Sequence, residues 1–264
     1  MQDYVLEIPT LKDCIDEYDV EAVHNASAGY DSAEIVAFGT SIYQGARPAA
    51  YDSHRKISAA LGAEFGPNLW ILPTNARMAY PYSALYAIAS AFKTEQQVGR
   101  KFDWLFWVDD DVIVPTSAYR TLRDAADAVE RPFVAAVGYD RRPPFHAAVW
   151  EWETTDAGLK LYRPWIDAKE SGVHKVACTG LCAAVFHRSL FERVPEPWFA
   201  VVPAQVNHES GGISKGINPD TWWSRQCEKA DVPVYVSCDL DVVHIGPNVP
   251  VCRETAKKLR QVFV

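Results

Sequence analysis

The chain has no long uncharged hydrophobic segment. None of its apolar runs approaches the roughly 20 residues needed to cross a bilayer. The segment from Met1 to Val20 is acidic and lacks an apolar core flanked by basic residues, so it does not resemble a secretory signal. We therefore expect a cytoplasmic protein with no integral membrane contact, while peripheral association stays open.

Closely spaced cysteine pairs are also missing. The six cysteines are scattered over the chain without a CxxC motif. Cys178 and Cys182 lie four residues apart, but no further Cys or His stands at the short spacing that a zinc site needs. We expect reduced, mostly buried thiols.

An excess of positive charge is absent. Lys plus Arg number 26 against 34 for Asp plus Glu, giving a net charge of −8. This balance disfavours a protein that binds nucleic acid with its whole surface. A local basic groove stays open, with candidates at 141–142 and among Arg253, Lys257, Lys258 and Arg260, although solvated surface charge explains these residues better.

The residues that are present favour an α/β domain. Hydrophobic residues make up 48% of the chain, enough for a sizeable core. Expected strands cover 35–38, 69–72, 104–108 and 133–137, and expected helices cover 48–61, 78–98 and 115–129. Strand 104–108 is apolar at every position, which is typical of a strand covered on both faces of a mostly parallel sheet.

Beyond Gly138 the expected elements are shorter. Strands are expected over 146–153, 159–162, 175–186 and 232–237, the third interrupted at Thr179-Gly180. Helices are expected over 221–230 and 254–262. The Pro-, Asn- and Gly-containing segment 203–219 is a candidate mobile lid, or an ordinary surface loop.

Three adjacent aspartates carry the strongest chemical signal. Asp109, Asp110 and Asp111 directly follow the apolar strand 104–108, and ligands of open α/β sheets bind beyond the carboxyl ends of strands. In extended chain the first and third side chains point the same way, so Asp109 and Asp111 can converge on a cation. Oxygen ligands suit Mn²⁺ or Mg²⁺. The alternative is an acidic cluster that faces solvent or favours a following helix.

Two later segments add weight to the cation hypothesis. Asp220 stands at an expected helix start, where it is either a functional acid or a helix cap. His244 ends an apolar strand, where it is either packed or a ligand for an Mn²⁺-type ion.

These motifs together resemble the GT-A nucleotide-sugar glycosyltransferases, and most of all the soluble family 2-like members. The resemblance rests on four motifs in order: WLFWVDDDV from Trp104, TGLCAAVFHR from Thr179, PDTWWSRQCEKADVPVYV from Pro219, and VHIG from Val243. It covers roughly residues 33–250. It implies an N-terminal extension (1–32), a GT-A catalytic domain (33–250) and a C-terminal helix (251–264). The implied fold is a Rossmann-like, mostly parallel central sheet flanked by helices, with a smaller mixed sheet on the acceptor side.

The resemblance also implies roles for individual residues. A metal ion would be held by Asp109 and Asp111 of the DxD motif and by His244, and the catalytic aspartate falls on Asp220, although Pro219 replaces the usual Glu of an acidic pair. The donor-binding residues would be Thr40, Ser41, Arg77 and Asp110. The acceptor-binding residues would be Thr179, Gly180, Trp222 and Trp223.

The reaction that this pattern predicts is the transfer of a sugar from a nucleotide-sugar donor to an acceptor hydroxyl. The ion offsets the charge that grows on the departing diphosphate, and Asp220 takes the proton of the attacking hydroxyl, which predicts inversion. If Asp220 only caps a helix, a retaining enzyme stays open. The acceptor is unknown: a glycan, a protein, a small molecule or a modified nucleic-acid base.

Three other functions fit parts of the pattern. A haloacid-dehalogenase-like phosphohydrolase also places DxD after an apolar strand, but its later acidic motif does not stand out here. A nucleotidyltransferase would release pyrophosphate. A non-catalytic sugar- or nucleotide-binding module would use its metal only for structure.

Overall fold

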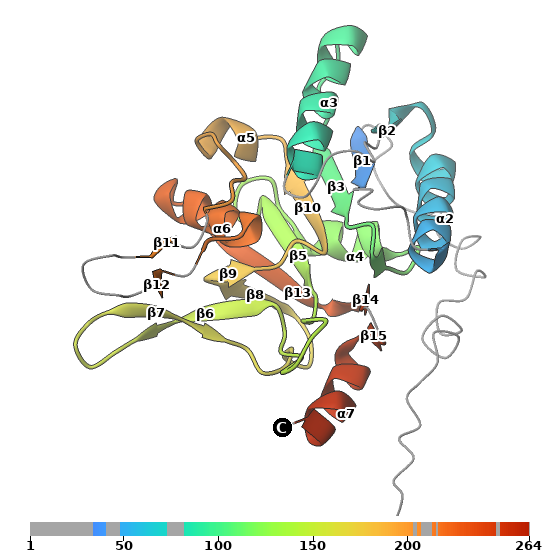
Figure 1. Cartoon of the computed structure of the whole chain (residues 1–264). Coiled ribbons are helices and arrows are strands. Elements are labelled where there is room, and N and C mark those ends of the chain that lie inside the picture. Colours follow the sequence, from blue (N-terminus) through green and yellow to red (C-terminus); the bar gives the residue numbers. More distant parts are fainter. Residues whose placement is uncertain are drawn as a thin grey trace, which may run out of the picture.

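A seven-stranded sheet forms the centre of the computed structural model, which describes residues 34–40, 48–72, 82–202, 205–206, 213–214, 216–246 and 249–263 (Figure 1). The strands in spatial order are β2 (Leu69–Ile71), β1 (Val36–Thr40), β3 (Trp104–Val108), β10 (Ala183–His187), β5 (Phe133–Val137), β13 (Val234–Asp241) and β8 (Val173–Val176). Neighbours pair in parallel at β2–β1, β1–β3 and β5–β13, and antiparallel at β3–β10, β10–β5 and β13–β8. The sheet is therefore mixed: β10 in its middle and β8 at its edge run opposite to the other five strands.

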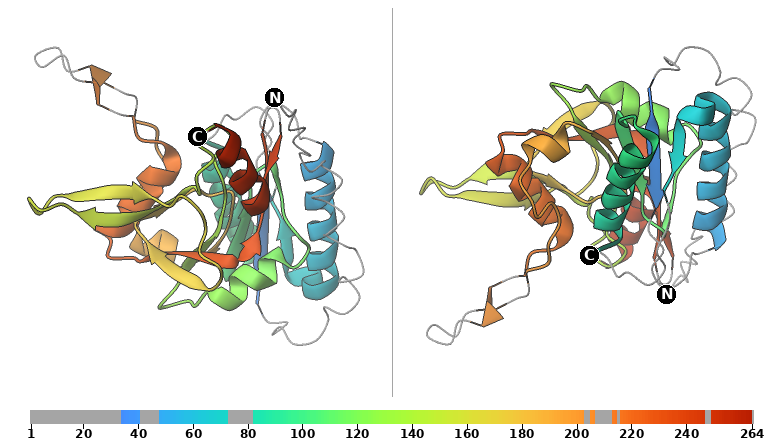
Figure 2. Two further views of the ribbon diagram at one scale, coloured as in Figure 1. Left: turned by 90° about the horizontal axis from the view of Figure 1, so that it is seen from below. Right: turned by 90° about the horizontal axis from the view of Figure 1, so that it is seen from above.

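Helices cover both faces of this sheet. On one face α2 (Pro48–Phe65) and α4 (Ala118–Ala125) contribute to one apolar cluster, and on the other α3 (Tyr82–Val98), α5 (Leu190–Arg193), α6 (Pro219–Lys229) and α7 (Arg253–Phe263) border a second cluster. Figure 2 shows α2 and α6 on opposite sides of the sheet. The 3-10 helix η2 (Gly66–Asn68) connects α2 to β2.

The apolar strand β3 explains why two layers of helices are needed. Trp104, Phe106 and Val108 lie in the cluster under α2 and α4, whereas Leu105 and Trp107 lie in the cluster on the other face. All five side chains are at most 2% exposed. The absence of alternation in this segment therefore predicted its two-sided burial correctly.

Three small sheets extend from the central layer in the described part of the chain. They consist of β7 (Lys160–Pro164), β6 (Val149–Thr154) and β9 (Cys178–Thr179); of β15 (Pro250–Val251), β14 (Val243–Ile245) and β4 (Val112–Ile113); and of β11 (Gln205–Val206) and β12 (Ile213–Ser214). The single strand expected over 175–186 is instead three strands. The chain changes sheet at the expected interruption, because β8 pairs with β13, β9 with β6, and β10 with β3 and β5.

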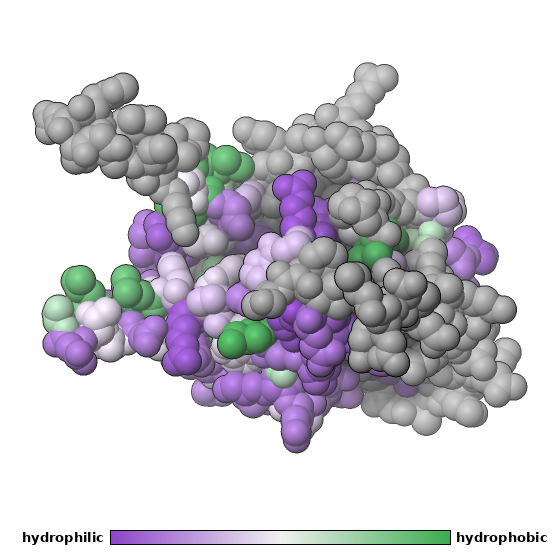
Figure 3. All heavy atoms as spheres, turned by 60° about the horizontal axis from the view of Figure 1, so that its bottom comes forward, coloured by the Kyte–Doolittle hydropathy of each residue, from purple (hydrophilic) through white to green (hydrophobic). Residues whose placement is uncertain are grey.

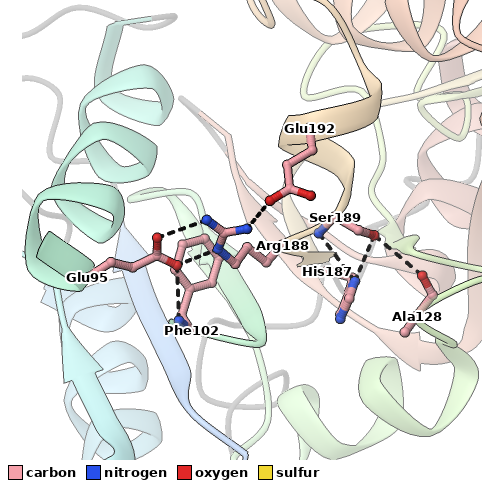
Figure 4. A network of polar contacts seen from close by, with 7 residues as sticks. All are labelled: Glu95, Phe102, Ala128, His187, Arg188, Ser189 and Glu192. Carbon is pink, nitrogen blue, oxygen red and sulfur yellow. Dashed lines mark hydrogen bonds and ion pairs between the residues drawn. The ribbon is translucent and has the colours of Figure 1, made fainter. Parts of the chain in front are cut away.

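A partly buried ion-pair network ties α3 to the segment after β10 (Figure 4). The Arg188 guanidinium donates to Glu95 through Nε at 2.5 Å and through Nη2 at 3.1 Å, and it also pairs with Glu192. Glu95 Oε1 accepts the Phe102 backbone amide at 3.2 Å. The network therefore fixes the C-terminal half of α3 against the entry to β3.

The β6–β7 hairpin projects away from the central sheet (Figures 1 and 2). Trp152 and Tyr162 are cross-strand partners whose rings stack with centroids 4.5 Å apart. Leu159 and Leu161 are 63% and 51% exposed near its turn, where Figure 3 shows apolar side chains at the surface.

Two further expectations concern the whole chain. Of the described helices, none is long and apolar enough to cross a membrane. The cysteines at 178, 182, 227, 238 and 252 are buried free thiols, as expected, while Cys14 lies outside the described residues.

Candidate functional site

Four parallel strands end at the same edge of the sheet. β1 is parallel to β3, and β5 is parallel to β13; β10 is antiparallel to both β3 and β5, so all four strands run the same way. Polar segments follow these strands, and ligands of α/β sheets bind beyond such carboxyl ends. The segments are Thr40 at the end of β1, 109–111 after β3, 138–142 after β5, and β14 after β13.

A small sheet brings the triple aspartate and the late histidine together. After β3 the chain turns, with the Val112 amide donating to the Asp109 carbonyl at 3.2 Å, and continues into β4. β4 pairs antiparallel with β14, which sets His244 opposite Val112. The Ile245 amide donates to the Asp111 carbonyl at 2.8 Å. The backbone therefore fixes the aspartates against β14.

Asp111 and His244 face each other directly. His244 Nε2 lies 3.3 Å from Asp111 Oδ1, and His244 Nδ1 lies 2.9 Å from the Tyr139 carbonyl. Because a carbonyl only accepts, Nδ1 carries a proton, and in the neutral imidazole Nε2 then presents its lone pair toward the carboxylate. Metal-ligating histidines donate one ring N–H to a backbone carbonyl in this way, while a protonated imidazole would form an ion pair with Asp111 at this distance.

Arg141 is the second side chain on this carboxylate. Its guanidinium pairs with Asp111 Oδ2, while the arginine side chain itself is 42% exposed.

Gly246 lies beside the backbone of Arg141: a Cβ built on Gly246 would be 3.5 Å from the Arg141 carbonyl and 2.6 Å from the Val249 carbonyl. A side chain at position 246 would therefore push these two backbone segments apart.

Asp109 is partly buried, like Asp110 and Asp111. Its Oδ1 accepts the Trp107 indole N–H at 3.0 Å, and its backbone amide donates to the Cys182 carbonyl at 2.9 Å. Burial raises the pKa of Asp109 well above its usual range, and the neighbouring charge of Asp111 raises it further. A cation between these carboxylates would relieve that repulsion.

Asp220 lies in the first turn of α6 but does not cap it. The cap is Asn218, whose side-chain oxygen accepts the Thr221 amide at 2.8 Å. Asp220 Oδ1 is buried and has no hydrogen-bond partner among the described residues. Burial raises the pKa of Asp220 to about 7, against the lowering effects of a backbone hydrogen bond from Leu181 and the charge of His244. The helix-cap alternative for this residue is therefore wrong.

The segment between β9 and β10 connects both acidic groups. A Cβ built on Gly180 would lie 3.2 Å from Ala148 Cβ and 3.7 Å from Asp220 Oδ2. The Gly180 amide donates to the Ala148 carbonyl at 2.7 Å, and the Cys182 carbonyl receives the Asp109 amide. Three consecutive residues thus reach from the carboxylate on α6 to the aspartates after β3, and glycine at position 180 lets these segments pack closely against Ala148.

Two residues expected to contact the acceptor are core residues instead. Thr179 is fully buried, and its hydroxyl donates to the Gly180 carbonyl at 3.2 Å. Trp223 is also fully buried, against rings that include Phe133 and Phe199. Neither side chain can present a surface to a ligand. Trp222 is partly exposed and donates through Nε1 to the Pro197 carbonyl at 2.7 Å.

The expected donor residues are described only in part. Thr40 ends β1, and its hydroxyl lies 3.2 Å from His54 Nδ1, which attaches it to α2. Asp110 is partly exposed in the turn between β3 and β4. Ser41 and Arg77 lie outside the described residues. The candidate lid 203–219 is likewise described only at β11, β12 and its last residues.

The side chains of Asp109, Asp111 and His244 are chemically suited to a hard divalent ion, because carboxylate oxygens and a neutral imidazole nitrogen are ligands for Mn²⁺. Within the described ranges, no group of three or more His, Cys, Asp or Glu side chains is arranged to hold a metal ion. The structure therefore brings together two side chains of this kind, Asp111 and His244, with Asp109 close in sequence to Asp111.

Comparison with known proteins leaves the family open. No family model matches this chain, and no curated protein matches it. The chain is similar to the crystal structure of A197 from STIV with a TM-score of 0.49 and 14% identity, over 84% of this chain and 91% of that one. A likeness at this level assigns neither a family nor an activity.

Sequence reasoning missed Arg141 as part of the site. It treated the pair 141–142 as surface charge, whereas the structure places Arg141 on Asp111. The available signal was its position after β5, since polar residues that follow parallel strands gather at one edge. Two of the other basic candidates have structural contacts: Arg253 donates to the Cys238 carbonyl at 2.6 Å, and Arg260 donates to Asp167 at 2.9 Å.

Proposed function

We propose that this chain is a metal-dependent GT-A glycosyltransferase that moves a sugar from a nucleotide-sugar donor to an acceptor hydroxyl. The observation that carries the proposal is that two kinds of acidic group lie at one edge of the sheet: a carboxylate that faces a histidine, and a partly buried carboxylate on α6. Asp111 faces His244 in a ligand-like arrangement, and Asp220 holds a buried, unpartnered oxygen. The mixed seven-stranded sheet is compatible with this fold.

Asp109, Asp111 and His244 are the proposed ligands of Mn²⁺ or Mg²⁺. When bound, the ion would offset the negative charge that develops on the departing diphosphate. The Tyr139 carbonyl keeps the imidazole in the tautomer that a ligand needs. Thr40 and Asp110, with Ser41 and Arg77, are the proposed contacts to the rest of the donor.

Asp220 is the proposed general base. Its pKa of about 7 places it where a carboxylate is both deprotonated near neutral pH and basic enough to accept a proton from a hydroxyl. Gly180 lies beside this carboxylate, and Trp222 is the remaining candidate for an acceptor contact. Attack from this side, opposite the leaving diphosphate, leads to inversion.

A ligand-binding screen tests the metal and donor assignment. Thermal unfolding is measured with UDP, GDP, CDP, ADP and dTDP, each with and without Mn²⁺. At least one nucleoside diphosphate should raise the melting temperature only with Mn²⁺, because a ligand of the folded state stabilises it. Asp111→Asn should abolish that shift, and Asp156→Asn, an exposed change in the β6–β7 turn, should leave it intact.

Activity then separates an enzyme from a binding module. The nucleotide-sugar that matches the stabilising nucleotide should be hydrolysed slowly by the unaltered chain and not by Asp111→Asn. Asp220→Asn should retain the Mn²⁺-dependent nucleotide shift and lose sugar transfer. Stabilisation by every nucleotide without metal, or equal activity in Asp111→Asn, would contradict the proposal.

A further inference from the structure

Among the described residues, the carboxylate of Asp111 has a partner on each oxygen. His244 Nε2 faces Oδ1 at 3.3 Å, and the Arg141 guanidinium pairs with Oδ2. A divalent ion bound by this carboxylate would therefore approach a permanent positive charge, since arginine stays protonated at all relevant pH values. Metal and guanidinium compete for the same group.

The two partners are held very differently. His244 is only 19% exposed, and both its backbone, in β14, and its Nδ1 are fixed by hydrogen bonds. The backbone of the loop carrying Arg141 is also fixed, with the Asp140 amide donating to the His146 carbonyl at 2.9 Å. The Arg141 side chain beyond that backbone is 42% exposed. Its guanidinium can therefore leave Asp111 while the imidazole stays in place.

A nucleotide-sugar supplies the group to which the guanidinium would move. Its diphosphate would bind the metal in the proposed site, and a planar guanidinium matches phosphate oxygens in a bidentate way. We propose that Arg141 exchanges partners: it neutralises Asp111 when the site is empty and binds the donor diphosphate when the metal takes Asp111. This inference rests on the proposed function and extends it by naming the residue that couples metal binding to donor binding.

The exchange predicts opposite effects on two affinities. Without Arg141, Mn²⁺ alone no longer displaces a guanidinium, so it should bind about fivefold more tightly, a typical size for coupling between two ligands. A nucleoside diphosphate loses its guanidinium contact, so at saturating Mn²⁺ it should bind about tenfold more weakly. A residue that only supports the structure would weaken both.

The test measures both affinities in three variants. Free Mn²⁺ is followed by electron paramagnetic resonance without nucleotide, and nucleoside diphosphate binding is followed by calorimetry at saturating Mn²⁺. Arg141→Gln should show the two opposite changes, and Arg141→Lys should retain competition with Mn²⁺ but bind the diphosphate less well than arginine. Arg142→Gln is the matched control, because it removes the same charge from the neighbouring exposed residue. Melting temperatures without metal report whether each variant folds.

The outcomes are separable from those of the proposed function. Unchanged affinities in Arg141→Gln, a loss of Mn²⁺ binding, or equal changes in Arg142→Gln would overturn the exchange. If the unaltered chain binds Mn²⁺ but none of the five nucleoside diphosphates, the glycosyltransferase proposal fails, and with it the diphosphate half of the exchange. The Mn²⁺ affinities alone then still decide whether Arg141 competes for Asp111.

Discussion

His244 Nε2 lies 3.3 Å from Asp111 Oδ1, and the pairing of β14 with β4 holds the two residues in register. Their contact depends on backbone hydrogen bonds as well as on the side chains, because the Ile245 amide donates to the Asp111 carbonyl. Loss of the imidazole should therefore leave the strand pair intact and affect mainly what binds to the carboxylate.

The first prediction follows from this contact. His244→Ala should weaken Mn²⁺ binding by about tenfold or more, in the range expected when a metal site loses a supporting group. The measurement is a titration with Mn²⁺ followed by electron paramagnetic resonance. His174→Ala is the control, because His174 lies on the edge strand β8 and contacts the Ser171 carbonyl. Equal Mn²⁺ affinity in both variants would count against His244 as a ligand.

The second prediction concerns pH and Asp220. Its pKa rises from 3.8 to about 7 on folding, so between these values the folded state binds more protons than the unfolded state. The free energy of unfolding therefore falls as pH rises through this window. Asp220→Asn cannot titrate at this position. The free energy of unfolding of this variant minus that of the unaltered chain should therefore be about 2–3 kcal/mol larger at pH 8 than at pH 5.

Chemical denaturation at both pH values, in the presence of EDTA, checks this prediction. Asp231→Asn, a matched change at an exposed aspartate just after α6, is the control. Sugar transfer should follow the opposite trend and rise with pH through about 7, since a base must be deprotonated. A stability difference that does not vary with pH would show that Asp220 is not buried as described.

The third prediction separates the adjacent tryptophans. Trp223 is fully buried among aromatic rings, so Trp223→Ala should reduce the free energy of unfolding by about 3–5 kcal/mol. Trp222 is partly exposed, and Trp222→Ala should cost less stability while lowering the apparent affinity for the acceptor. Urea denaturation of the two variants gives the comparison, and equal losses would refute it.

The fourth prediction addresses the network in Figure 4. Arg188→Ala leaves Glu95, which is only 10% exposed, without its guanidinium, and should cost about 2–3 kcal/mol. Adding Glu95→Gln should recover part of that loss, because the uncompensated charge is removed. Arg55→Ala breaks the exposed pair with Asp52 and should cost less than about 1 kcal/mol. Additive losses at Arg188 and Glu95 would show that the two side chains act independently.

The sequence predicted those features that depend on local pattern. The apolar stretch at β3 and the aspartates after it identified a buried strand and a polar strand end, and both lie where expected. It was harder to predict which residues of a helix point into the core. Trp222 and Trp223 are neighbours on α6, and only the packing of that helix decides which ring enters the core.

Sheet direction and the role of Arg141 could not be read from the chain. The reversed strand β10 has the same apolar composition as its parallel neighbours, since both faces of the sheet are covered. Arg141 contacts Asp111 only because β5 and β3 run in the same direction with β10 between them. Such a contact depends on strand order, which single-sequence patterns do not encode.

The C-terminal helix α7 is connected to His244 through a chain of hydrogen bonds. Arg260 donates to the Phe145 carbonyl at 2.6 Å and to Asp167, and Asp167 accepts the Tyr139 hydroxyl at 2.6 Å. Tyr139 in turn orients His244 through its carbonyl. A chain shortened by this helix would lose the support behind the imidazole, and under the proposed function its affinity for the metal ion should fall.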